Sequence, residues 1–261
     1  MNTELTVRRD HLAGHRHLII GRSLVAALAG ALPIPLLDEG LLYIILRGTM
    51  RKLAHGHQID IDERAARHII FGASEPSSLG VLATSMVVFR AMARSFRKVM
   101  IAYMATRRAQ AAAHSFTTAT LFDHYCARLH VGFGIDSETG EALRETMERA
   151  IAETQGGLGR DLFRRGVVAA IKATVRAPLE LANIVSRGAV DRLLASKDPD
   201  AVVVAEELDL DLALERELVS HSSFIARATT AIELQLSVDA NPYLDQLVDN
   251  FERMWRDRRQ S

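Results

Sequence analysis

The sequence contains only one cysteine, Cys126, among its 261 residues. A single cysteine cannot build a disulfide framework or a cysteine-rich zinc site, and it suits the reducing conditions of the cytoplasm. Aromatic residues amount to only 5% and do not alternate with basic positions, and 32 lysines and arginines balance 32 aspartates and glutamates. These figures argue against a general attraction to nucleic acid. We therefore expect no nucleic-acid partner.

The sequence motifs of the common cofactor-dependent and metal-dependent enzymes are also missing. The chain has no GxxxxGK[ST] phosphate-binding loop, no GxGxxG after a strand, no GxSxG and no HExxH. An all-helical enzyme usually needs a metal or a cofactor for its chemistry. The sequence therefore favours a non-catalytic role, and it predicts no catalytic residue, no cofactor and no cofactor-binding residue.

Helical periodicity with start signals runs along the chain. We predict helices over residues 10–32, 39–55, 60–70, 74–113, 121–131, a segment after 136, 160–195 and a last segment after 241. The run Val202-Val203-Val204 is the only strand-like stretch. We therefore predict an all-α multi-helix bundle that forms a single domain over residues 1–261. Gln155-Gly156-Gly157 is the best boundary between two halves, 1–155 and 156–261, and the likeness of 47–53 to 187–193 hints that the halves are pseudo-repeats.

The most unusual segment is the apolar stretch from Leu24 to Arg51, which Pro33-Ile34-Pro35 interrupts and Asp38-Glu39 restarts. This pattern predicts a helical hairpin broken by a Pro-x-Pro turn. Only fifteen apolar residues precede Asp38, which is ~22 Å of helix at 1.5 Å per residue, against ~30 Å of hydrocarbon in a bilayer. A clean membrane span is therefore not expected. Shallow insertion of the hairpin tip and burial inside a helical core both stay open.

The segment from Gly21 to Asp62 resembles the membrane-associated helical domain of bacterial EcsC-like proteins. It is also similar to the domain that follows the G domain in some bacterial GTPases. The resemblance rests on a Gly/Ala-rich apolar helix, then Pro33-Ile34-Pro35-Leu36-Leu37-Asp38, Arg47-Gly48-Thr49-Met50-Arg51-Lys52-Leu53-Ala54 and Ile59-Asp60-Ile61-Asp62. This chain has no G domain, so no nucleotide role carries over. The resemblance implies an all-α fold, peripheral or shallow membrane association and no catalytic residues.

These features favour a cytoplasmic protein that docks on the inner membrane or on a membrane complex. The expected contacts are the apolar hairpin tip and nearby basic side chains, which bind lipid phosphates well: Pro33, Ile34, Pro35, Leu36, Leu37, Arg47, Arg51, Lys52, Arg90, Arg94, Arg97 and Lys98. Two other functions stay open. One is a soluble helical scaffold that binds a protein partner through the acidic segment 198–217, and the other is a metal-dependent helical enzyme.

Ten histidines underlie the metal hypothesis. His11 and His15 share a predicted helical face with His17 near them, and His55 and His57 flank a glycine at a helix end. The best cluster in sequence comprises Asp123, His124, Cys126 and His130. Zinc or iron needs three or four such groups that converge on one point. Sequence spacing does not show that convergence, so these four residues are candidates and no metal site is predicted.

Membrane docking predicts that the expressed protein is recovered with the membrane fraction. Release by high salt would indicate electrostatic docking through arginines, because salt screens exposed charges. Resistance to both salt and carbonate would indicate an inserted Leu24–Leu46 hairpin. Recovery wholly in the soluble fraction would contradict docking and favour the scaffold.

Overall fold

The structure is a computed structural model that describes residues 3–29, 37–72, 97–154, 226, 228–233 and 242–260. Of these described residues, 87% are helical. The prediction of an all-α multi-helix fold is therefore confirmed. The boundary at 155–157, the repeat at 187–193 and the acidic segment 198–217 lie outside the described residues, so the two halves stay a prediction.

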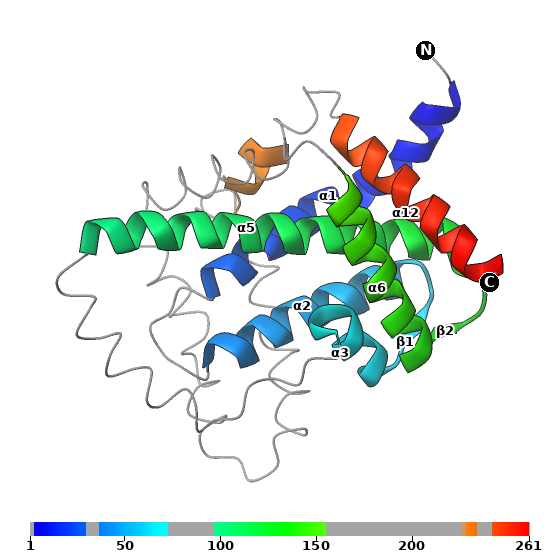
Figure 1. Cartoon of the computed structure of the whole chain (residues 1–261), viewed down its shortest axis with the longest axis horizontal. Coiled ribbons are helices and arrows are strands. Elements are labelled where there is room, and N and C mark those ends of the chain that lie inside the picture. Colours follow the sequence, from blue (N-terminus) through cyan, green and yellow to red (C-terminus); the bar gives the residue numbers. More distant parts are fainter. Residues whose placement is uncertain are drawn as a thin grey trace, which may run out of the picture.

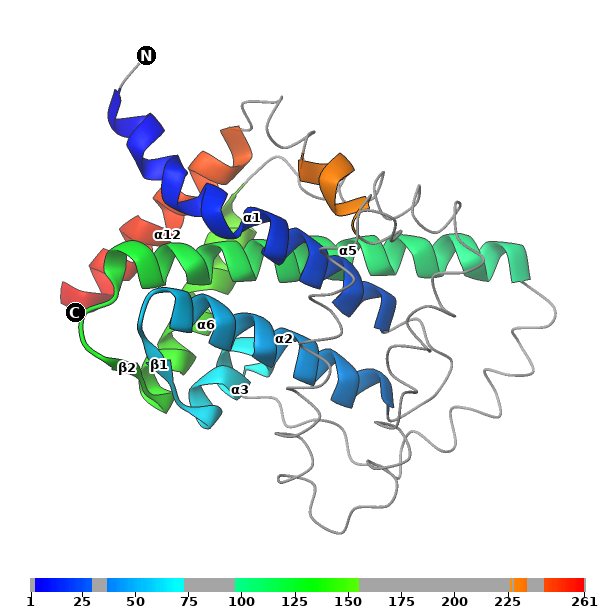
Figure 2. The ribbon, with the colours of Figure 1, turned by 180° about the vertical axis from the view of Figure 1, so that it is seen from behind.

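Helix α5 is the centre of the described arrangement (Figure 1). It lies between α1 and α2 on one side and α6 and α12 on the other, as the two opposite views show (Figure 2). Short α3 packs against α6. The helix bounds are α1 Thr3–Ala29, α2 Leu37–Gly56, α3 Glu63–Phe71, α5 Arg97–His124, α6 Ser137–Glu153 and α12 Pro242–Gln260.

Two short strands and one π-helical turn complete the described elements. Strand β1 (Asp60–Ile61) pairs in parallel with β2 (Gly134–Ile135). The π-helix η1 (Tyr125–Leu129) extends α5 directly. The sequence prediction placed no strand in either position, because two residues are too few to show a period-two pattern.

Helix starts agree with the sequence prediction at α6 and differ from it at α3. The carboxylate of Asp136 accepts a hydrogen bond of 2.9 Å from the Thr139 backbone N–H and caps α6, as expected. The predicted helix start at residue 60 is wrong, because Asp60 belongs to β1. Asp62 caps α3 instead, and its carboxylate accepts a hydrogen bond of 3.1 Å from the Arg64 backbone N–H. Residues 60 and 61 are extended because they pair with β2, so α3 begins only at Glu63.

Helix α5 also corrects a predicted boundary. The helical pattern predicts a break between residues 113 and 121, but α5 runs unbroken from Arg97 to His124. The hydroxyls of Thr117 and Thr120 donate hydrogen bonds to the backbone carbonyls four residues earlier. The threonine-rich stretch is therefore compatible with an interior helix, although its composition is typical of a loop.

One apolar cluster joins all the described helices. Its fully buried members are aliphatic and aromatic side chains from each of them: Ile19, Ile20, Leu53, Ile69, Leu121, Phe122, Met147 and Phe251. The described ends of the apolar hairpin contribute to burial as well, with Leu24, Val25, Ile44 and Ile45 all buried. Residues 30–36 lie outside the described part. Among the residues that the structure describes, no helix combines the length and the apolar character that a membrane crossing requires.

The α3–α6 contact depends on Gly140. A Cβ atom at this position would lie 2.8 Å from the Cα and the backbone oxygen of Ala65, which is closer than packed atoms approach. We expect Gly140→Ala to lower the free energy of unfolding by about 1–3 kcal/mol, since the helices must separate.

Gly14→Ala in α1 is the matched control, because nothing lies within 4 Å of the Cβ that it adds. It should raise the free energy of unfolding by about 0.5–1 kcal/mol through helix propensity. Urea unfolding of both variants measures the difference. Equal effects of the two substitutions would show that α3 and α6 are not in this close contact.

Candidate metal centre

The candidate site is built around the carboxylate of Asp123, in the last turn of α5. Its side chain has 0% exposure to solvent. A buried carboxylate is costly unless hydrogen bonds or charges compensate it. The neighbouring elements must therefore supply partners to Asp123.

Two histidines from other elements supply those partners. His15 Nδ1 in α1 lies 2.9 Å from Asp123 Oδ1, and His57 Nε2 after α2 lies 2.8 Å from the same oxygen. A carboxylate oxygen only accepts hydrogen bonds, so each ring nitrogen donates to it. The two imidazole rings meet nearly edge to face, with centroids 5.3 Å apart and planes at 87°. Residues that lie 108 and 66 positions before Asp123 in the sequence thus converge on one of its atoms.

Gly56 makes room for the His15 ring. A Cβ atom at Gly56 would lie 3.1 Å from His15 Nε2 and 3.2 Å from His15 Cε1. A side chain at residue 56 would press on the His15 ring and displace it slightly. The glycine between the two histidines of the His55-Gly56-His57 sequence therefore has a positional role in the site.

A tight reversal after α2 aims His57 inward. Gln58 has φ 60°, in the left-handed region that ends many helices. Ile59 N–H then donates to the Ala54 carbonyl at 2.9 Å and closes the turn. As a result His57 is 20% exposed and points to Asp123, whereas His55, two residues earlier, is exposed.

The three side chains can hold a metal ion. One donor atom from each of His15, His57 and Asp123 lies within 4.8 Å of the other two. Ligand bonds of 2.0–2.1 Å in a tetrahedral site separate donor atoms by about 3.3 Å. The observed nitrogen–oxygen distances of 2.8 and 2.9 Å are a little shorter, so the donors need only small outward shifts.

The second carboxylate oxygen supports the same interpretation. Asp123 Oδ2 is buried and has no hydrogen-bond partner among the described residues. An unsatisfied buried oxygen on an acid costs stability, and a cation bound at this position would compensate it. Two imidazoles and one carboxylate form a donor set that suits zinc, iron, cobalt or nickel better than magnesium or calcium.

His124 turns away from this cluster and forms a separate chain of contacts. His124 Nδ1 lies 3.1 Å from His11 Nε2, and His124 Nε2 lies 3.1 Å from Glu252 Oε1 in α12. Both ring nitrogens are therefore engaged on opposite sides of the ring. The residues line up instead of converging, and they connect α1, α5 and α12.

The remaining two sequence candidates, Cys126 and His130, do not belong to the converging group. The Cys126 thiol is buried, and this burial raises its pKa well above the ordinary value. His130 Nδ1 lies 3.1 Å from the Tyr125 hydroxyl, and desolvation lowers the pKa of this histidine. Burial also raises the pKa of Tyr125 to about 12. Cys126 and His130 are four residues apart, a spacing that would put them on one face of an α-helix. Residues 125–129 form a π-helix instead, so this shared face is not maintained.

Part of the predicted membrane contact can be placed. Arg47 is buried and pairs with Glu63, and Arg51 Nη2 lies 3.3 Å from the same carboxylate. Lys52 is half-buried. Residues 33–36, 90 and 94, and the side chains of residues 37, 97 and 98, lie outside the described part. Lipid contact by this set stays a prediction.

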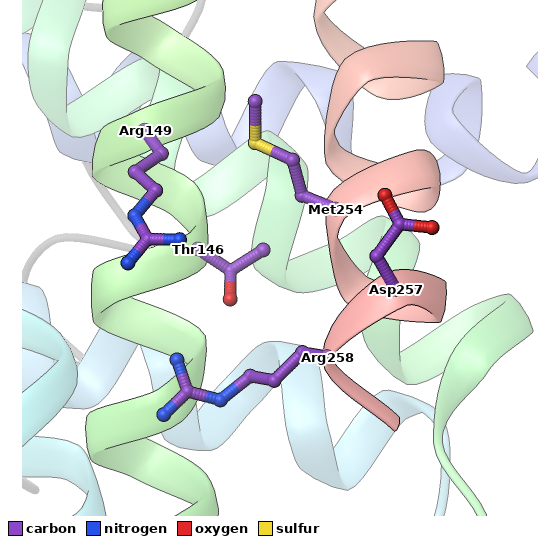
Figure 3. Close-up of a pocket in the computed structure, with 5 residues that line it drawn as sticks. All are labelled: Thr146, Arg149, Met254, Asp257 and Arg258. Atoms are coloured by element: carbon purple, nitrogen blue, oxygen red, sulfur yellow. The ribbon is translucent and has the colours of Figure 1, made fainter. Parts of the chain in front are cut away.

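A surface pocket of about 590 Å³ between α6 and α12 is a weaker candidate (Figure 3). Its two arginines, Arg149 and Arg258, both pair with Glu145 on α6, at 3.0 and 2.5 Å. The hydrogen bond from Arg258 lowers the pKa of Glu145. The pocket thus contains an internal network of ion pairs that already neutralises much of its positive charge.

We predict that Asp123→Asn lowers the free energy of unfolding by about 1–3 kcal/mol, because the buried amide nitrogen would have no acceptor where Oδ2 now lies. Urea unfolding measures the change. Asp257→Asn, at an exposed position of α12, is the control and should change stability by less than about 0.5 kcal/mol. Equal stability of the two variants would contradict the buried environment assigned to Asp123.

Comparison with known proteins finds no family model, no curated protein and no solved structure that matches this chain. The resemblance to EcsC-like proteins therefore stays a prediction from the sequence.

Proposed function

We propose that this chain is a helical metal-binding protein that holds one divalent transition-metal ion at His15, His57 and Asp123. The observation that carries the proposal is the convergence of two imidazole nitrogens on one oxygen of a fully buried carboxylate. The third function predicted from the sequence is a metal-dependent helical enzyme. The present proposal shares the metal with it, but it assigns a different ligand set and no reaction. Of the four sequence candidates, only Asp123 belongs to it.

Metal binding would require each histidine to lose the proton on the ring nitrogen that now faces Asp123. His15 would present the lone pair of Nδ1 and carry its proton on Nε2, while His57 would present Nε2 and carry its proton on Nδ1. The ion would then take the place of two N–H donors around Asp123 Oδ1. It would neutralise the buried carboxylate more completely than hydrogen bonds do.

The ion would also join three separate segments. His15 belongs to α1, His57 to the turn between α2 and β1, and Asp123 to α5. Because the unfolded chain does not hold these groups together, most of the binding free energy adds to the stability of the fold. The proposal therefore links metal occupancy to the packing of α1 against α5.

Zinc titration of metal-free protein tests this function. We expect one zinc ion per chain by calorimetry, and at zinc concentrations a hundred times Kd the free energy of unfolding should rise by about 2.7 kcal/mol. Treatment with a chelator should reverse the gain. A chain that binds no zinc, cobalt, nickel or iron in stoichiometric amount would rule out the proposed function.

Two histidine variants form a matched pair for the same measurement. His57→Gln removes a proposed ligand and should weaken zinc binding by at least roughly tenfold, since loss of an outer-shell partner alone often costs that much. His55→Gln removes an exposed histidine two residues away and should bind zinc like the parent protein. Circular dichroism establishes that both variants remain helical. Equal affinities would place the zinc elsewhere.

A further inference from the structure

We infer that the metal ion at His15, His57 and Asp123 keeps at least one coordination position for a small anionic ligand from solvent. This inference rests on the proposed metal site and adds the class of ligand that the site takes. Three protein donors are typical of catalytic and ligand-exchanging sites, whereas structural zinc sites have four.

The three donor side chains differ in exposure, and this difference indicates which side of the site faces the solvent. Asp123 has 0% side-chain exposure, His57 has 20% and His15 has 31%. An ion between them would have the buried carboxylate on its inner side and the edges of two partly exposed imidazoles on its outer side. Its remaining coordination positions would therefore face the solvent.

Other donor groups near this site are engaged elsewhere or do not belong to the converging set. His124 uses both ring nitrogens, for His11 and Glu252. His55 is exposed. The buried Cys126 thiol, whose pKa is raised by burial and then by the charge of Asp123, is not one of the three donors that converge. Among the residues that the structure describes, His15, His57 and Asp123 form the one group that meets the geometry of a metal site.

Charge balance favours an anion at the open position. A divalent ion with one carboxylate and two neutral imidazoles carries a residual charge of +1. In a partly buried site that charge is less screened than in water. A small monoanion with a nitrogen or oxygen donor, such as azide or a simple carboxylate, would neutralise it and displace water without any change in the protein ligands.

Cobalt-substituted full-length protein tests the inference, because the visible d–d absorption of Co²⁺ responds to its ligands. We expect one Co²⁺ per chain and a saturable shift of its visible bands when sodium azide is added. Sodium perchlorate at the same ionic strength should leave the bands in place, since perchlorate coordinates poorly. Bands that are present but do not respond to azide would overturn the open position while leaving the metal site intact.

The variants His55→Gln and His57→Gln show whether the cobalt ion that responds to azide is bound at the proposed site. His55→Gln should keep both the cobalt bands and the azide shift, whereas His57→Gln should lose them. Absence of cobalt bands from the parent protein would overturn the metal site itself, and the open position with it. An azide response that survives in His57→Gln would place the responding ion at another position and would also overturn the inference.

Discussion

The burial of the Asp123 carboxylate is the constraint on which the candidate site and much of the helix arrangement depend. A charge with no exposure to water has to be compensated inside the protein, or folding becomes unfavourable. His15 and His57 provide that compensation from α1 and from the turn after α2. The requirement therefore determines where these two segments lie relative to α5, and it also creates the donor set that we assign to a metal.

Histidine–carboxylate contacts recur at the other helix contacts. His124 lies 3.1 Å from Glu252, which links α5 to α12, and His114 lies 3.3 Å from Glu148, which links α5 to α6. The apolar cluster supplies most of the driving force for folding, because it removes side chains of all the described helices from water. A hydrophobic face tolerates sliding and rotation, whereas a directional contact does not. The buried His124–Glu252 pair therefore restricts how α12 can lie against α5, whereas the His114–Glu148 pair is about 40% exposed on both sides and contributes less.

Sequence reasoning predicted the helical class and several element boundaries, because these depend on local patterns. The helix that begins after Asp136 and the last helix, which begins after residue 241, are examples. It missed the β1–β2 pair and the continuity of α5 through its threonines. It also noted His15, His57 and Asp123 separately, since spacing along one helix cannot show that residues from three segments meet.

The sequence by itself determined the all-α class, the absence of a disulfide framework and the amphipathic faces, because composition and helical periodicity are properties of neighbouring residues. Only the tertiary structure decided which histidines meet Asp123. The left-handed turn at Gln58 and the missing side chain at Gly56 bring His57 and His15 together, while rotation along α5 sends His124 to α12. Convergence of donors is a long-range property, because it depends on helix packing that no local pattern encodes.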